Sequence, residues 1–123
     1  MHFAKGTKLF CIFAVDLCNI RNMKEEEIQK QPCKAAKSKD VEYVYLLTNA
    51  FMPGLVKIGR TSRCEVKARI DELYNTSVPV PFEGRYACEV PSNKSKEIES
   101  AIHTALADKR VNEKREFFQI DYR

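Results

Sequence analysis

The sequence predicts an α/β (α+β) domain in which a small three-stranded antiparallel sheet is flanked by helices. A run of β-branched and aromatic residues from Val41 to Thr48 is followed by an alternating run from Leu55 to Gly59. The turn between them contains Pro53-Gly54, as expected for two strands of a hairpin. Downstream, the apolar period changes to that of a helix, returns to that of a strand and changes again. The predicted order is therefore β-β-α-β-α.

The later elements follow from the same reading of apolar spacing. Residues 65–75 carry apolar side chains on one helical face, and residues 84–90 predict the third strand. A second helix is predicted from Ser95, as its N-cap, to about Asp108. A loop then leads to a short apolar end at residues 117–120, predicted as a final strand or turn.

Residues 1–40 are predicted to be an N-terminal extension or linker of uncertain order, and residues 41–123 the domain. The stretch 24–40 is polar, highly charged and interrupted by a proline, which is typical of a linker or a frayed helix. The apolar run from Leu9 to Val15 is short and lacks a cleavage site of small residues. We interpret it as a local hydrophobic element rather than a signal or a membrane span. A natural translation start at Met23 stays open.

Charge and cysteine content limit the class of protein. The net charge of +4 suits an anionic partner, but residues 1–40 contribute most of it. Attraction to phosphate must therefore come from local clustering. The five cysteines are odd in number and lie in no C-x-x-C pair. This pattern predicts plain thiols in a reducing cytoplasm, with neither a disulfide framework nor a zinc site.

Basic residues cluster after the second predicted strand. Gly59 closes that strand, and Arg60, Thr61 and Arg63 come directly after it. Five basic residues and a single acid lie within positions 57–69. Such local clustering predicts attraction to a phosphate backbone.

Side chains suited to phosphodiester hydrolysis lie on the neighbouring elements. Glu99 and His103 are four residues apart and share one face of the second helix. Hydrolysis needs a cation on the phosphate, a carboxylate to hold it, a base for the water and a fixed positive group. Glu99, Tyr45 and Arg69 can fill the last three roles. Taken singly, these residue types are more often surface charges or core tyrosines, so spacing alone is weakly specific.

Two segments carry a family resemblance. Tyr43 to Asn49 and Val56 to Thr61 resemble the paired strands of the GIY-YIG nuclease superfamily. Val44-Tyr45 stands at the family's "IY", Lys57 to Gly59 at its "YIG", and Arg69 at the arginine of the following helix. The proline loop, second helix and C-terminal phenylalanine pair resemble a compact single-domain branch that is widespread in phage and bacterial genomes. The resemblance covers nearly all of the predicted domain.

The resemblance implies a metal-dependent endonuclease, a hydrolase of DNA phosphodiester bonds that uses Mg²⁺ or Mn²⁺. It implies that Tyr45 activates or orients water and that Arg69 stabilises the pentacovalent phosphate. Glu99 would bind the metal, and His103 would assist proton transfer or contact phosphate. Gly59 would permit close backbone approach to the substrate. The phosphate site would be lined by Arg60, Thr61 and Arg63.

Departures from the family pattern leave alternatives open. Tyr43 replaces the first glycine of GIY, which a strand tolerates, and Lys57 replaces the first tyrosine of YIG. That lysine removes a hydroxyl to which the family assigns a catalytic role. A lysine there could bind phosphate, act as a base if desolvation lowers its pKa, or mark weak or absent catalysis. The metal ligand is Glu99 or, alternatively, Glu116.

Two other functions stay open beside the nuclease. One is a catalytically inactive nucleic-acid-binding module that retains the GIY-YIG fold. The other is a small structural or regulatory protein whose leading segment binds a partner. The expected partner is DNA of unspecified strandedness and sequence, with no membrane, for a cytoplasmic monomer or weak homodimer.

Overall fold

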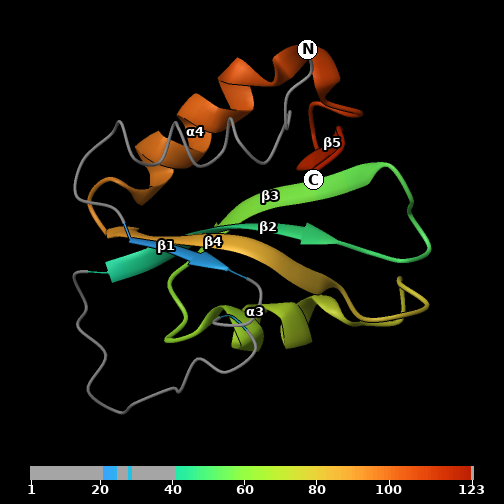
Figure 1. Cartoon of the computed structure of the whole chain (residues 1–123), viewed down its shortest axis with the longest axis horizontal. Coiled ribbons are helices and arrows are strands. Elements are labelled where there is room, and N and C mark those ends of the chain that lie inside the picture. Colours follow the sequence, from blue (N-terminus) through green and yellow to red (C-terminus); the bar gives the residue numbers. More distant parts are fainter. Residues whose placement is uncertain (1–20, 25–27, 29–40, 123) are drawn as a thin grey trace.

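Five antiparallel strands form one sheet with a helix on each face, in a computed structural model that describes residues 21–24, 28 and 41–122. The strand order is β1-β4-β2-β3-β5. Helix α4 lies over one face and α3 over the other (Figure 1). In chain order the elements are β1 (Arg21–Lys24), β2 (Val41–Thr48), β3 (Leu55–Thr61), α3 (Val66–Leu73), β4 (Glu83–Pro91), α4 (Ser95–Ala105), the 3-10 turn η1 (Ala107–Lys109) and β5 (Phe117–Gln119).

The β2–β3 hairpin forms as its sequence predicts. Gly54 has a φ of 82°, a conformation that glycine adopts without steric cost. Asn49 is buried and ties the turn together, because its side chain accepts a hydrogen bond from the Phe51 amide and donates one to the Val80 carbonyl, both at 2.9 Å. The second bond also holds the proline loop in place. The register sets Tyr45 opposite Gly59.

Alternate residues of β2 divide the core into two clusters. Val44 and Leu46 pack with Ile98 and Ile102 of α4 and with the β5 residue Phe118. On the other face, the core consists of Ile28, Tyr43, Tyr45, Leu47, Val66, Ile70, Phe82 and Ala87. The period-two alternation of a strand therefore decides which side chains can meet each helix.

The mixed α+β class is confirmed, but the sheet has five strands rather than three. The short β5 forms by pairing with Leu55–Lys57 of β3. Strand β1 pairs with β4, from Arg21 opposite Glu89 to Lys24 opposite Tyr86. Neither strand has a strong local signal, because each is short and depends on a partner distant in sequence. Residues 1–20, 25–27 and 29–40, including the apolar run and most of the predicted linker, lie outside the described residues.

The structure tests the predicted cap of α4 and the predicted state of two cysteines. Ser95 was predicted as the N-cap of α4, but Lys94 occupies that position. The Ser95 hydroxyl instead donates to Glu42 Oε1 at 2.6 Å. Cys88 is a buried thiol as predicted, whereas Cys64 is disulfide-bonded, contrary to the prediction. Among the described helices, none has the length and apolarity needed to cross a membrane.

Candidate active site

The candidate site surrounds the last residues of β3, which continue beyond Phe117, the first residue of β5. Strand β5 pairs with β3 only from Leu55 to Lys57. Directly before β5, the Glu116 carbonyl accepts a hydrogen bond from the Ile58 amide at 3.1 Å. Side chains from both faces of the sheet meet around the continuing part of β3. A hollow of about 550 Å³ there is lined by Arg60, Thr61, Ser62, Arg63, Arg69, Glu72, Glu99 and Glu116.

A tyrosine–arginine pair reaches the site from the α3 face. Tyr45 is 1% exposed, and its hydroxyl accepts a hydrogen bond from Arg69 Nε at 3.4 Å. Burial raises the pKa of Tyr45, so the phenol stays protonated at neutral pH. The Tyr45 hydrogen bond raises the pKa of Arg69, whose guanidinium also contacts Glu72 at 3.2 Å. The pair therefore presents a neutral hydroxyl and a fixed positive charge.

Gly59 makes room for this arrangement. A Cβ atom at Gly59 would lie 2.7 Å from the Tyr45 hydroxyl oxygen and 3.0 Å from Glu116 Oε2. Both polar atoms thus occupy space that any other residue at this position would fill. Close backbone approach of the substrate at Gly59 stays a prediction, and the structure shows a second use of the missing side chain, which leaves room for the Tyr45 hydroxyl and the Glu116 carboxylate.

Substituting Gly59 by alanine is expected to lower the free energy of unfolding by about 1 to 3 kcal/mol, because the added methyl overpacks the site. Urea denaturation measures this change. Combining Gly59→Ala with Tyr45→Phe should recover part of the loss, since the closest contact is to the tyrosine hydroxyl. An unchanged denaturation midpoint in the single variant would show that Tyr45 and Glu116 move away at no cost.

Glu99 and His103 reach the site from the α4 face. His103 Nε2 lies 2.8 Å from the Ile58 carbonyl oxygen. A carbonyl only accepts, so Nε2 carries the proton and Nδ1 holds the lone pair of the neutral ring. Burial lowers the pKa of His103 and favours that neutral form. Burial and the nearby Glu116 carboxylate raise the pKa of Glu99 to about 7.

Three potential metal ligands converge here. One ligand atom from each of Glu99, His103 and Glu116 lies within 4.8 Å of the other two. Within the described residues, Glu116 Oε2 is buried without a hydrogen-bond partner. An orphaned carboxylate oxygen beside a second carboxylate is costly unless a cation or a shared proton compensates it. The donor set therefore fits a divalent metal ion.

Replacing Glu99 by glutamine is expected to stabilise the metal-free protein at neutral and higher pH. The folded-state pKa of about 7 exceeds the ordinary 4.5, so the folded state retains a proton that the unfolded chain releases. Wild-type stability should fall as pH rises through this window and then level off. Glutamine cannot ionise. The free energy of unfolding of the variant should therefore exceed that of wild type by on the order of 1 to 3 kcal/mol at about pH 8, and the difference should vanish near pH 4.

Urea denaturation in EDTA at the two pH values measures this prediction. Glu97→Gln is the matched control, because it removes an exposed carboxylate from the same helix, where Glu97 pairs only loosely with Lys94 at 3.6 Å. A Glu99→Gln advantage that stays the same at both pH values would rule out carboxylate repulsion as its cause.

Lys57 and Arg60 bring positive charge to the carboxylates. Lys57 Nζ lies 3.9 Å from Glu116 Oε1 and 5.3 Å from the centre of the Phe117 ring. Burial lowers the pKa of Lys57. Arg60 contacts Glu42 at 3.3 Å and Glu99 at 3.7 Å. Both cations therefore lie against acidic groups rather than facing solvent alone.

The remaining predicted phosphate ligands, Thr61 and Arg63, also line the hollow. Thr61 is buried, and its hydroxyl accepts a hydrogen bond from the Arg63 amide at 3.0 Å. The Arg63 side chain is 60% exposed and contacts Glu72 at 2.6 Å. The structure thus gathers every sequence-predicted site residue around one stretch of β3, although Arg63 lies at its rim.

Sequence reasoning missed two acids that hold the arginines. Glu72 contacts both Arg63 and Arg69, and its position three residues after Arg69 was a readable helical spacing. Glu42 contacts Arg60. Its signal was the hairpin register, because Val44 pairs with Arg60 and Glu42 is the diagonal neighbour on the same face.

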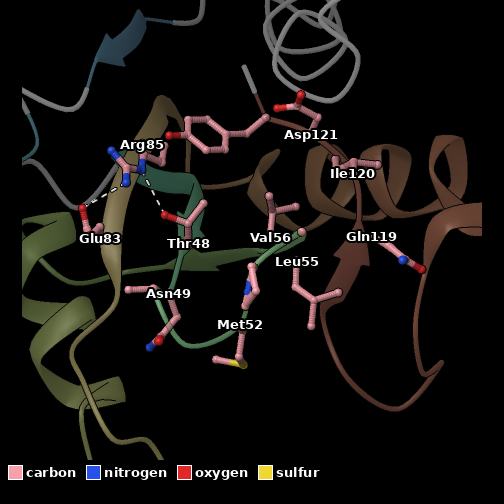
Figure 2. A pocket seen from close by; sticks show the side chains of 14 residues that line it. Thr48, Asn49, Met52, Leu55, Val56, Glu83, Arg85, Gln119, Ile120 and Asp121 are labelled. Atoms are coloured by element: carbon pink, nitrogen blue, oxygen red, sulfur yellow. Dashed lines mark hydrogen bonds and ion pairs between the residues drawn. The ribbon is translucent and has the colours of Figure 1, made fainter.

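A larger hollow, of about 630 Å³, lies at the turn end of the hairpin. Figure 2 shows Arg85 between Glu83 and Thr48, to which it donates hydrogen bonds at 3.0 and 2.9 Å. The Tyr122 ring lies 5.0 Å from the same guanidinium. No group of three potential metal ligands occurs in this hollow within the described residues. The chemistry therefore favours the smaller hollow at β3.

Comparison with known proteins identifies the family of this domain. Residues 42–123 match the family model of the T5orf172 domain, a phage-associated domain in the GIY-YIG-like class of nucleases. No curated protein and no solved structure matches the chain. The resemblance seen in the sequence is supported for that class.

Proposed function

We propose that this chain, which belongs to the T5orf172 domain family, is a metal-dependent endonuclease that hydrolyses DNA phosphodiester bonds. One observation carries the proposal. The Tyr45–Arg69 pair from one face of the sheet and the cluster of Glu99, His103 and Glu116 from the other meet around Gly59. A neutral hydroxyl, a fixed cation and a metal-binding set are the parts that phosphodiester hydrolysis requires.

The carboxylates Glu99 and Glu116 would hold Mg²⁺ or Mn²⁺. When bound, the ion would neutralise charge on the phosphate and polarise it toward attack. The buried, unpartnered Oε2 of Glu116 supports this assignment. So does the raised pKa of Glu99, whose largest causes are burial and the charge of Glu116.

Tyr45 and Arg69 would divide two further tasks. Because burial raises the pKa of Tyr45, its hydroxyl is suited to orienting the attacking water by hydrogen bonding rather than to acting as a phenolate base. Arg69 would stabilise the negative charge that develops on the phosphate. Its contacts with Tyr45 and Glu72 hold the guanidinium in one place before substrate arrives.

The basic residues after Gly59 would bring the DNA backbone to this centre. Arg60 and Arg63 line the hollow on opposite sides of Thr61 in sequence. Arginine contacts with backbone phosphates would supply attraction without base specificity.

A second candidate is a silent nucleic-acid-binding module that keeps the same hollow. Lys57 favours it, because this residue stands where the related nucleases carry a tyrosine hydroxyl. Lysine has no hydroxyl to replace it, and the Lys57 ammonium lies 3.9 Å from Glu116 Oε1. Under this reading the arginines bind phosphate and no bond is cut.

Tyr45→Phe separates the two candidates. Labelled single-stranded and duplex DNA would be incubated with wild type and variant in Mn²⁺, with DNA binding measured on the same samples. For the nuclease, removing the hydroxyl that orients the attacking water is expected to slow cleavage about 100-fold and to leave binding within about threefold. Wild-type binding without any cutting would select the silent module.

A further inference from the structure

We infer that His103 is the third ligand of a single metal site with Glu99 and Glu116, and that this site prefers Mn²⁺ and related transition metals to Mg²⁺. The inference rests on the proposed function for the role of the ion in cleavage. Binding of the ion itself can be tested without DNA. Glu99 alone, or Glu116 as its alternative, was the ligand expected from sequence.

The spacing of the three donors suits one ion. Their ligand atoms lie within 4.8 Å of one another. Ligands that share an ion at about 2.1 Å are separated by roughly 3 to 4.2 Å. Small rotations of the carboxylates are enough to close this difference. The donors also come from two different segments, α4 and the residue before β5, which fixes the site by tertiary structure.

His103 has the surroundings of a metal-bound histidine. Its Nε2 donates to the Ile58 carbonyl at 2.8 Å, and that carbonyl belongs to β3. The ring also packs on Phe118, with centroids 5.1 Å apart. A backbone acceptor on one ring nitrogen is what fixes the tautomer and orientation of metal-ligating histidines. With Nε2 as the donor, Nδ1 carries the lone pair of the neutral ring, and we assign it as the metal-binding atom.

Glu116 faces the Glu99 carboxylate, and a proton shared between the two acids is the alternative to a metal ion for compensating their charge. Lys57 lies near Oε1 at 3.9 Å, while Oε2 is buried without a hydrogen-bond partner in the described part of the chain. Arg60 reaches Glu99 only at 3.7 Å. Both ion pairs are too long for strong hydrogen bonds. The two carboxylates thus retain coordinating capacity despite the nearby cations.

The imidazole decides the metal class. Mg²⁺ prefers oxygen ligands, keeps several waters and is bound through one or two carboxylates. Imidazole nitrogen suits first-row transition metals, whose affinity for such sites rises from Mn²⁺ onward. A site with only Glu99 and Glu116 would accept either ion. His103 adds a ligand that favours Mn²⁺ and its neighbours.

Calorimetric titration of the purified full chain with MnCl₂ and with MgCl₂ tests this inference. We expect wild type to bind Mn²⁺ about tenfold or more tightly than Mg²⁺. His103→Ala should weaken Mn²⁺ binding about tenfold or more while changing Mg²⁺ binding less than about threefold. Glu116→Gln should weaken both, and Glu97→Gln on the exposed side of the same helix should weaken neither.

A spectroscopic measurement protects the test against a misfolded variant. Pulsed electron paramagnetic resonance of Mn²⁺ bound to wild type should show a directly coordinated nitrogen, and this signal should be absent in His103→Ala. Equal affinity for the two ions, or no coupled nitrogen, would overturn the inference. Nitrogen-coordinated Mn²⁺ without DNA cleavage would sink the proposed nuclease and leave the metal site intact. DNA cleavage by a protein that binds Mg²⁺ and Mn²⁺ equally well would support the proposed nuclease and overturn the inference about His103.

Discussion

Replacing Glu99 by glutamine is expected to lower the rate of DNA cleavage roughly a thousandfold, equivalent to about 4 kcal/mol of transition-state stabilisation. Glutamine keeps the size of the side chain but removes the charge that the cation requires. Single-turnover cleavage in saturating Mn²⁺ measures the loss. The same substitution is expected to stabilise the metal-free fold above neutral pH, so a loss of cleavage cannot be assigned to unfolding.

The control for this prediction lies two residues away. Glu97 is on the exposed side of α4 and pairs with Lys94, so Glu97→Gln should cleave at close to the wild-type rate. A Glu99→Gln variant that retains cleavage within about threefold of wild type, a difference below 1 kcal/mol, would show that Glu99 holds no catalytic ion.

Arg69→Ala is expected to reduce kcat about 100- to 1,000-fold with little change in KM, because a preorganised positive group acts mainly on charge that develops in the transition state. Steady-state kinetics on a labelled duplex separates the two constants. Arg69→Lys should recover only part of the rate, because lysine lacks the planar guanidinium that both Tyr45 and Glu72 orient.

Lys67→Ala is the matched control for Arg69. It removes a positive charge from the same helix, where Lys67 forms an exposed pair with Asp71 at 3.5 Å. Its effect should be a small rise in KM from weaker attraction to DNA. If Arg69→Ala likewise raised only KM, the arginine would be a binding contact, and its proposed role in the transition state would be wrong.

Local patterns were enough to predict the centre of the fold. Strand β2 spans Val41–Thr48 as predicted, because a run of β-branched and aromatic residues before a Pro-Gly turn strongly favours a strand. Both helices were predicted with small errors at their ends. Strand β1 was not predicted, since its residues form a strand only against β4. Ser95 is the first residue of α4 rather than its cap, and its hydroxyl donates to Glu42, which is distant in sequence.

The candidate site was predictable in its residues and not in its connections. Family positions identified Tyr45, Arg69 and Glu99 as candidates, and the structure brings them to one region, while their roles stay predictions. Sequence treated Glu116 as an alternative to Glu99, whereas the structure places both beside His103. These side chains come from elements on both faces of the sheet and meet around the last residues of β3, beyond its pairing with β5. No local spacing in the sequence encodes this arrangement.

Lys57 acquires a partner that the sequence did not suggest. As a departure from the family pattern it had several possible meanings, including phosphate binding and loss of activity. In the structure its ammonium lies against Glu116 and over Phe117. The lysine therefore partly balances the charge of Glu116, one of the two carboxylates of the metal-binding set. This pairing makes Lys57 a supporting residue in the proposed enzyme.

Cleavage by the wild-type chain with and without metal tests the central proposal most directly. Labelled single-stranded and duplex DNA would be incubated with Mn²⁺, with Mg²⁺ and with EDTA, and bound DNA would be measured in each sample. The proposed nuclease cuts in Mn²⁺, and EDTA stops the cutting while DNA remains bound. Binding without cutting under every metal would contradict the proposal and identify a recognition module. Lys57→Tyr would then be the first variant to test for cleavage.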